Sequence, residues 1–347
     1  MLKRIVTFII ALSVVMMPLL FNGCGKKEAE LTMLQLEYVE NFKIMQLADI
    51  QAETSEKCEN AFTDIKKLVK KEEPNLIVLT GDNVYMPESE DLFNTLVSNM
   101  ESLNTPWAAV FGNHDSEGVL SKNAMADKFT EAENCLFYKG EKGVDGVGNY
   151  VINLTTAQNK IEYSVFLLDS HMYAKGGYDW IRDNQIKWYE RAVNEITRLN
   201  GNKVVPSLAF FHIPLQEYID AKESLDNGES EGFGVFKEDI SPGVVNAGFF
   251  SKALELKSTK AIFCGHDHVN NCDINYQGIH LVYGLKSSKC SYYDKSLLGA
   301  TVITLSTDNI EIRNSYFDDP SRIFEIRINI QPKTKIYFFV KRFSTNS

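Results

Sequence analysis

The chain has 347 residues, of which 44% are apolar and 24% are charged, so it can bury a substantial core as one large domain or two small ones. Its formal net charge of −10 disfavours nucleic acid as the main partner, because phosphate backbones are bound by clustered lysine and arginine. An acidic protein that handles phosphates must take positive charge from elsewhere, and metal ions are the obvious source.

Residues 1–24 have the features of an export signal. Two basic residues precede an apolar run, Ile5–Phe21, which is short for a membrane span. Gly23-Cys24 then resembles the cleavage site of a bacterial lipoprotein, in which the cysteine becomes the lipidated first residue. A simple cleaved signal and an uncleaved anchor are the alternatives. We therefore expect an exported, extracytoplasmic protein that is lipid-anchored to a bacterial cell membrane, with residues 25–41 as a tether and entry segment.

A series of short apolar runs predicts buried strands, each of which ends in polar residues. In chain order these runs end at Asp49, Asp82, Asn113-His114-Asp115, Asp169-Ser170-His171, His212, and His266 with His268. Helical spacing marks residues 57–74, and also residues 183–201, with Asp183 as the N-cap and Gly201 as the stop. Strands that alternate with helices predict an α/β sheet with helices on both faces, and sites in such sheets lie beyond the carboxyl ends of the strands.

The strand-end residues form a donor set that suits a pair of metal ions. Carboxylates, imidazoles and one amide carbonyl together favour Fe, Mn or Zn. Two ions need a bridging ligand, for which Asp82 is the natural candidate, and Gly81 before it allows a tight backbone turn. The candidate metal ligands are Asp49, Asp82, Asn113, His212, His266 and His268.

The order of five motifs resembles the signature of the calcineurin-like metallophosphoesterases, and most of all the purple-acid-phosphatase-like branch. The motifs are DIQ, GDNVY, GNHD, HIP and GHDH. The resemblance covers residues 42–318, the expected catalytic domain. It implies two stacked mixed β-sheets flanked by helices.

The resemblance also implies a role for each candidate. Asp49 and His268 would bind the first metal ion, whereas Asn113, His212 and His266 would bind the second, with Asp82 bridging both. A hydroxide held between the ions would attack phosphorus in line with the departing oxygen. His114 would bind a phosphoryl oxygen or protonate the leaving group, and Asp115 would fix the orientation of His114.

Two positions bear on the first metal site. Many family members carry histidine as a ligand where this chain has Gln51, whose amide oxygen is a weaker ligand. Tyr85 lies three residues after Asp82, where purple acid phosphatases carry a tyrosinate ligand to ferric iron. The alternative for Tyr85 is a ring that packs against the sheet.

Outside the motifs the sequence is less informative. His171 and Tyr173 are expected either to line the substrate pocket or to be structural, and the cysteines that follow Cys24 are expected to be unpaired. Residues 319–347 form a basic C-terminal tail of unknown role: a final hairpin, a surface-binding tail or a poorly ordered end.

The favoured function is hydrolysis of phosphate esters, with monoesters preferred to diesters, on a phosphorylated small molecule or a phosphoprotein. The alternative is a surface-binding lipoprotein on a catalytically weakened form of the same fold, for which Gln51 is the support. A nuclease would require a basic groove, which the acidic balance disfavours.

Overall fold

The computed structural model describes residues 31–87, 89–319 and 324–330. The expected signal sequence therefore lies outside the described residues, as does most of the expected C-terminal tail. Within the described ranges, no helix combines the length and the apolar character that crossing a bilayer requires. The five cysteines in these ranges are all unpaired, as expected.

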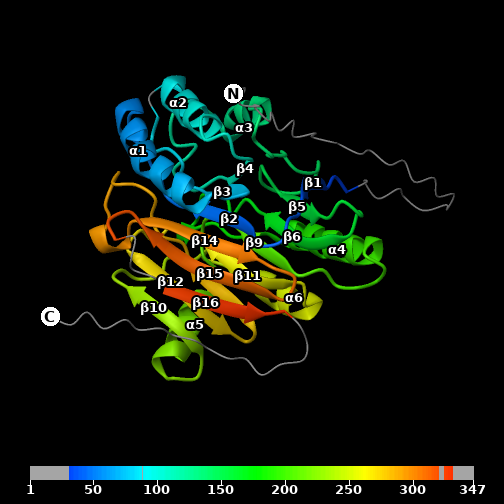
Figure 1. Cartoon of the computed structure of the whole chain (residues 1–347). Coiled ribbons are helices and arrows are strands. Elements are labelled where there is room, and N and C mark those ends of the chain that lie inside the picture. The colour runs from blue at the N-terminus through cyan, green and yellow to red at the C-terminus, as the bar shows by residue number, and fades with distance from the viewer. Residues whose placement is uncertain (1–30, 88, 320–323, 331–347) are drawn as a thin grey trace, which may run out of the picture.

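Two large mixed sheets stack face to face, and helices cover their outer sides, which confirms the predicted architecture (Figure 1). The eight-stranded sheet has the order β1 (Leu34–Glu37), β5 (Tyr150–Thr155), β6 (Ile161–Leu167), β9 (Ser207–Phe210), β11 (Thr259–Cys264), β13 (Ile279–Tyr283), β12 (Asn270–Tyr276) and β10 (Glu231–Phe236). The six-stranded sheet has the order β16 (Phe324–Asn329), β15 (Asn309–Tyr316), β14 (Gly299–Leu305), β2 (Phe42–Leu47), β3 (Leu76–Thr80) and β4 (Trp107–Val110). A short hairpin, β7 (Tyr173–Ala174) and β8 (Gly177–Tyr178), stands apart from both.

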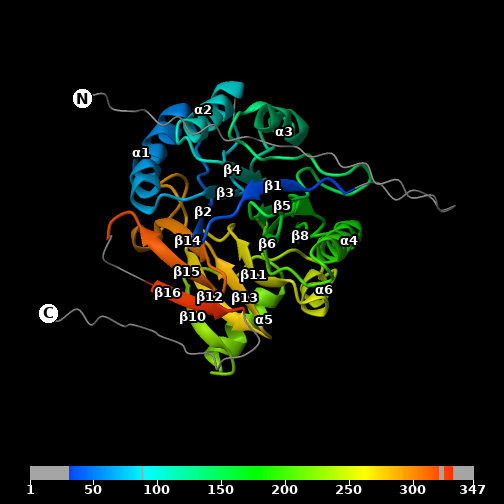
Figure 2. The same ribbon diagram turned by 45° about the vertical axis from the view of Figure 1, so that its right-hand side comes forward.

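The helices form the outer layers of the sandwich. The six α-helices of the described chain are α1 (Ser55–Glu72), α2 (Glu90–Glu101), α3 (Lys122–Glu131), α4 (Asp183–Leu199), α5 (Glu217–Asp226) and α6 (Phe249–Leu256). The first three gather beside β2, β3 and β4, whereas α4 and α6 lie on the side of the eight-stranded sheet (Figure 2). A single 3₁₀ turn, Lys295–Leu297, precedes β14. Helix α4 begins at Asp183 with Arg182 in the cap position, so the expected N-cap is instead the first helical residue.

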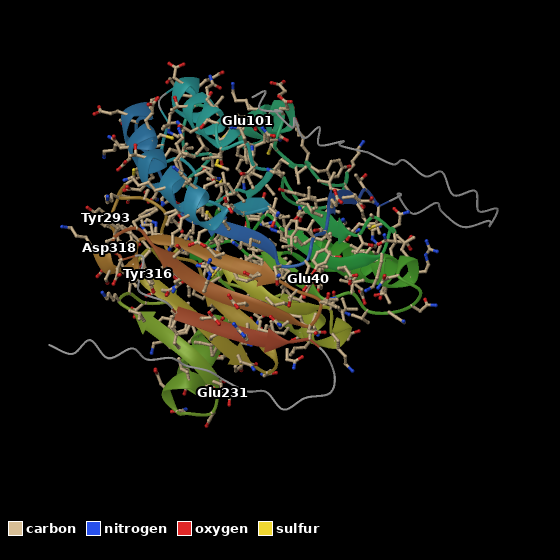
Figure 3. The ribbon with its side chains drawn as sticks, viewed as in Figure 1. Glu40, Glu101, Glu231, Tyr293, Tyr316 and Asp318 are labelled. Atoms are coloured by element: carbon tan, nitrogen blue, oxygen red, sulfur yellow. The ribbon has the colours of Figure 1, made fainter. Side chains whose placement is uncertain are left out.

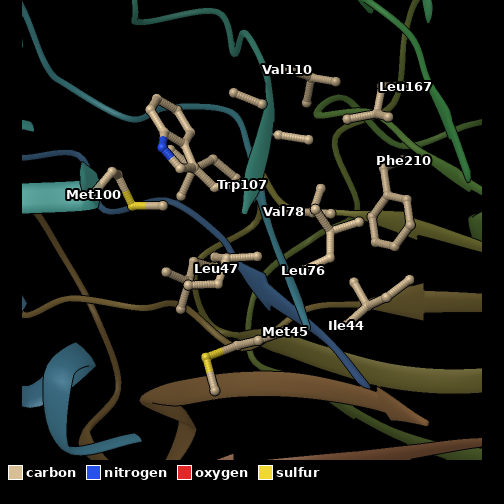
Figure 4. Close-up of a cluster of buried hydrophobic side chains, with 14 of the residues drawn as sticks. Ile44, Met45, Leu47, Leu76, Val78, Met100, Trp107, Val110, Leu167 and Phe210 are labelled. Carbon is tan, nitrogen blue, oxygen red and sulfur yellow. The ribbon is translucent and has the colours of Figure 1, made fainter. Parts of the chain in front are cut away.

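The core follows from the alternation of side chains along the strands. In the six-stranded sheet, Ile44 and Val78 face Phe210 of the other sheet, while Met45 and Leu47 point to the opposite side, toward the helices (Figure 4). Both faces of the sheet are therefore buried at β2, β3 and β4, which explains the nearly continuous apolar runs in these three strands. Side chains fill the space between the layers, and Glu231 of the edge strand β10 lies at the periphery (Figure 3).

The domain extends past both of its expected boundaries. Strand β1, from the segment expected to be a tether, pairs in parallel with β5. Strand β16, from the expected tail, pairs with β15 and completes the edge of the six-stranded sheet. Residues 324–329 therefore belong to the folded domain, whereas residues 331–347 of the expected tail lie outside the described residues.

A buried ion pair ties α1 to the six-stranded sheet. Glu72, at the end of α1, accepts hydrogen bonds from Arg313 and, at 2.7 Å, from the Ser315 hydroxyl on β15. Burial opposes ionisation, but these partners outweigh it and lower the pKa of Glu72 from 4.5 to about 2. Because the pKa is lower in the folded state, this stabilisation is complete above about pH 5 and is lost as the pH falls from about 4.5 toward 2.

The Glu72→Ala substitution is expected to lower the free energy of unfolding at pH 7 by about 2–4 kcal/mol, because it leaves a partly buried guanidinium without its carboxylate. Urea denaturation at pH 7 and at pH 3 measures the effect, which should shrink at the lower pH. Glu59→Ala, at an exposed position of the same helix, is the matched control. A loss of less than about 0.5 kcal/mol at pH 7, within the range of ordinary surface substitutions, would show that the pair does not stabilise the domain.

Candidate metal centre

The candidate ligands lie where parallel strands of both sheets end. Strands β2, β3 and β4 run parallel to one another, as do β6, β9 and β11, so their carboxyl ends share an edge. Polar residues that follow these strands therefore meet between the sheets. The structure brings all six candidates, Asp49, Asp82, Asn113, His212, His266 and His268, into one buried cluster.

The first half of the cluster contains Asp49, Asp82 and His268. One ligand atom from each lies within 4.8 Å of the others. The Nε2 atom of His268 is 3.6 Å from Oδ1 of Asp49. This spacing allows one ion to contact all three.

The second half is centred on His212. Its Nε2 atom lies 3.1 Å from Oδ1 of Asn113 and 3.2 Å from Nδ1 of His266. The same Nε2 atom is 3.4 Å from Oδ1 of Asp82. Asp82 therefore contacts both halves, which is the position that a bridging carboxylate requires.

Backbone carbonyls orient two of the imidazoles. The Nδ1 atom of His212 donates to the Thr80 carbonyl at 2.9 Å, and Nδ1 of His268 donates to the Tyr292 carbonyl at 3.1 Å. Donation from Nδ1 leaves the lone pair on Nε2, and Nε2 is the atom that faces the cluster in both residues. The rings are thus held in the tautomer that binds a metal.

The backbone around the cluster is held in an uncommon conformation. Asp49, Gln51, Asp82 and His266 have φ angles of 53°, 47°, 47° and 80°, in the left-handed region that non-glycine residues rarely adopt. Such strain persists only where the surrounding structure fixes it, and it is concentrated at functional sites.

Glycines next to the ligands permit close approach. A Cβ atom on Gly112 would lie 2.1 Å from Oδ1 of Asp82, and one on Gly265 would lie 2.5 Å from Oδ2 of Asp49. The glycine in each of these motifs therefore makes room for a carboxylate.

Electrostatics in the cluster favour a cation. Burial, together with the Asp82 carboxylate, raises the pKa of Asp49 to about 6. Burial alone would also raise the pKa of Asp82. The nearby His212 and His114 outweigh burial, and the pKa of Asp82 is lowered. Burial also lowers the pKa of His268 to about 3, which keeps its imidazole in the neutral, metal-binding form.

His212 shows the opposite shift. Burial alone would lower the pKa of His212, but the adjacent Asp82 carboxylate raises it to about 9. His212 and Asp82 thus stabilise each other's charged forms, and a cation between the two groups would take over the role of the proton.

Gln51 provides an independent test of whether these residues suit metal ions. Its side chain is buried beside Asp82, with Nε2 3.4 Å from Oδ2 of Asp82. Its Oε1 atom is buried and has no hydrogen-bond partner. A buried amide oxygen without a partner is costly, and a metal ion next to Asp82 would satisfy it. The donor set therefore fits two cations, with Gln51 as an additional oxygen donor to the first.

His114 lies at the open side of the cluster. Its Nε2 atom is 4.0 Å from Oδ2 of Asp82, close to the ions that Asp82 would hold. Its Nδ1 atom lies 2.6 Å from Oε2 of Glu117, and Oε1 of Glu117 accepts a hydrogen bond from the Tyr173 hydroxyl at 2.7 Å. Tyr173 in turn accepts from the Asn113 amide at 3.0 Å. Glu117 thus orients His114 and links it to a candidate metal ligand.

The expectation that Asp115 orients His114 is wrong. The Asp115 carboxylate is fully buried and accepts from the backbone N–H groups of Asn83, Val84 and Gly112 at 2.7–3.0 Å. The Asn83 side-chain amide donates as well, at 3.0 Å, and these four donors converge because the loops after β3 and β4 both turn at this point. Asp115 therefore positions the loops that carry Asp82 and Asn113, and it does not contact the imidazole of His114.

The neighbouring aromatic residues also have defined places. The ring of Tyr85 meets the His114 ring edge-on, with centroids 4.9 Å apart, so Tyr85 contacts a histidine of the site. Of the two residues expected either to line the pocket or to be structural, Tyr173 joins the site. His171 Nε2 instead bonds Gln185 Oε1 of α4 at 2.8 Å, a structural contact.

Two site residues escaped the sequence analysis. Glu117 lies three residues after His114, and this separation is a weak signal that belongs to no motif. Lys286 is buried in the loop after β13 and donates to the Asp49 carbonyl at 2.7 Å. No local pattern marks Lys286, because its contact depends on the pairing of distant segments.

Comparison with known proteins agrees with this geometry. The sequence model of the family described as "Calcineurin-like phosphoesterase" matches residues 42–270. The chain belongs to the calcineurin-like phosphoesterase family. The match covers the strands that carry all six candidate ligands.

Relatives of this family member include plant and yeast proteins. It is 30% identical over 280 residues to the "Probable inactive purple acid phosphatase 29" of Arabidopsis thaliana, covering 70% of this chain and 71% of that protein. It is 30% identical over 261 residues to "Phosphatase DCR2" of Saccharomyces cerevisiae, covering 66% of this chain and 44% of that protein.

Among solved structures, a dimetal phosphatase from Danio rerio has the same fold, with a TM-score of 0.57 and 11% identity. The alignment covers 84% of this chain and all of that protein. The predicted fold class and the resemblance to purple-acid-phosphatase-like proteins are thereby confirmed.

Proposed function

We propose that this protein is an active metal-dependent phosphoesterase that cleaves phosphate monoesters in preference to diesters. The observation that supports it most is the position of Asp82, whose carboxylate lies between the His268 half and the His212 half of the cluster. When bound, two metal ions supply Lewis acidity to the phosphoryl oxygens and lower the pKa of water. We propose Fe, Mn or Zn as the metals, from the mixture of oxygen and nitrogen donors.

The protein's own residues place and protonate the ester. His114 stands beside the cluster with Nε2 toward Asp82, where it can donate a hydrogen bond to a phosphoryl oxygen or a proton to the leaving oxygen. Glu117 accepts from Nδ1 of His114 and thereby fixes the ring. A monoester offers three terminal oxygens, enough for contacts to both cations and to His114, whereas a diester offers two.

We further propose that the protein is exported and held at a bacterial membrane by a lipid on Cys24, on the basis of the N-terminal sequence. Its substrates would then be extracytoplasmic phosphorylated small molecules or phosphoproteins. The acidic balance of the chain supports a role without nucleic acid.

Purified protein is expected to hydrolyse p-nitrophenyl phosphate faster than bis-p-nitrophenyl phosphate once supplied with Mn²⁺, Fe or Zn²⁺, and to lose activity on chelation. Colorimetric assay of both esters over the metal panel measures this. The word "inactive" in the names of plant relatives makes a binding function the competing outcome. If the protein binds metal but cleaves neither ester with any ion, that binding function replaces the proposal.

A further inference from the structure

The site opens among exposed apolar side chains. Ten large apolar residues of the described chain are exposed, and five of them adjoin residues of the site in sequence or are linked to such residues by contacts. We call these five the rim: Met86, Val119, Tyr173, Val244 and Tyr292. They are between 38% and 61% exposed, and exposed apolar side chains beside a site are candidates for ligand contact.

Direct contacts join one side of the rim to the metal-site histidines. The ring of Tyr292 stacks on His268, with centroids 4.2 Å apart. The Val244 N–H donates to the Tyr178 carbonyl at 3.0 Å, and the Tyr178 ring meets His266 edge-on at 4.2 Å. Tyr292 therefore contacts one candidate ligand directly, and Val244 is linked to another through Tyr178.

The other side of the rim borders His114. Met86 follows Tyr85, whose ring contacts His114. The Val119 N–H donates to the Pro87 carbonyl at 3.1 Å, which places Val119 on the same loop surface as Met86. An ester with its phosphorus between the cations and His114 would project its alcohol part toward these side chains.

Two carboxylates lie beside tyrosines of the rim. Glu117 accepts from Tyr173, and Glu238 accepts from the Tyr292 hydroxyl at 2.9 Å. Among the described residues, the buried Lys286 is the only lysine or arginine that is hydrogen-bonded to a candidate ligand. A further phosphate beside Glu117 or Glu238 would therefore be repelled by a carboxylate.

We infer that the rim binds the alcohol part of the substrate, and that the substrate is a singly phosphorylated ester of a bulky apolar alcohol. This inference rests on the proposed phosphoesterase function. Apolar area on the substrate is buried against the rim, and the two glutamates exclude polyanionic esters such as nucleoside triphosphates.

A series of alkyl phosphates tests the inference, because ethyl, butyl and hexyl phosphate share nearly the same leaving-group chemistry. Full burial of a methylene gives about a fourfold gain in binding, so on a half-open rim we expect kcat/KM to rise about twofold per methylene and about tenfold or more from ethyl to hexyl. A flat or falling series, or a preference for ATP over hexyl phosphate, would overturn the inference. No hydrolysis of any ester, including p-nitrophenyl phosphate, would instead reject the proposed function.

Substitutions in the rim test whether the preference for long alkyl chains arises there. The double variant Met86→Ser with Val119→Ser is expected to lower the hexyl-to-ethyl ratio of kcat/KM to about one or two. Leu199→Ser, an equally exposed apolar position at the end of α4, is the matched control and should keep the wild-type ratio. Lys175→Ala, at the exposed turn between β7 and β8, should also keep it. An unchanged ratio in the double variant, or a lowered ratio in either control, would contradict the assignment.

A singly phosphorylated ester of an apolar alcohol can be either a lipid phosphate in a membrane or a soluble ester. Phosphatidylcholine vesicles that contain phosphatidate distinguish them. Phosphate release from the vesicles, reduced in the double variant, supports a lipid source, whereas release from hexyl phosphate alone supports a soluble ester.

Discussion

Asp82→Asn is expected to remove bound metal from both halves of the centre and to lower kcat by about 10³-fold or more. The Asp82 carboxylate lies close to ligand atoms of both the His268 half and the His212 half. An amide has one acceptor oxygen and no charge, so it cannot bridge two cations, and the loss of several kcal/mol of charge stabilisation corresponds to this factor.

The measurement is metal content by elemental analysis, alongside hydrolysis of p-nitrophenyl phosphate. Asp273→Asn is the matched control, since Asp273 is an equally buried carboxylate hydrogen-bonded to a histidine, His280 at 2.5 Å, but belongs to no part of the cluster. The control should retain both metal ions. If Asp82→Asn kept two ions and activity within tenfold of the wild type, the bridging role would be refuted.

Much of this centre was predictable from the sequence because its residues follow strands. A run such as Leu76–Thr80 predicts a buried strand from local composition alone, and the rules of α/β sheets then place Asp82, two residues after the strand, at the shared edge. The same reasoning places Asp49, Asn113 and His212. The identity of these ligands follows from local sequence patterns, and their meeting at one edge follows from a rule of α/β topology.

Other features depend on contacts that no local pattern encodes. Asp115 was expected to orient His114 because the two are neighbours in sequence, yet three backbone donors from loops after different strands hold its carboxylate. Glu117 takes that place through the geometry of a loop. Strand β1 lay in the expected tether because its short, half-exposed segment gives little signal, and its partner β5 is more than a hundred residues away.

The positions of the rim residues illustrate the same limit. Exposed apolar side chains such as Val119 are unremarkable one at a time in a sequence. They become informative only when the fold places several of them around one opening. Specificity in this fold is therefore decided by loops whose composition says little until their neighbours are known.

His114→Ala is expected to lower kcat for hexyl phosphate by about 10²–10⁴-fold without changing the metal content. An alkoxide is a poor leaving group and depends on a proton or hydrogen bond from His114, whereas p-nitrophenolate leaves without one. The loss should therefore be clearly smaller on p-nitrophenyl phosphate. Comparing both esters in wild type and variant separates protonation of the leaving group from simple loss of phosphate binding, which would affect the two esters equally.

Glu117→Gln is expected to reproduce this pattern at a smaller amplitude, about 10–100-fold on hexyl phosphate, because a positioning partner acts through the group that it holds. The Glu117 carboxylate lies 2.6 Å from Nδ1 of His114, and glutamine preserves its size while removing its charge. Glu141→Gln, which removes a carboxylate paired with Arg191 at 2.8 Å, is the control and should leave both esters unaffected. Equal losses on the two esters, or a fall in metal content, would show that Glu117 supports the metal centre through Tyr173 and Asn113 instead of orienting His114.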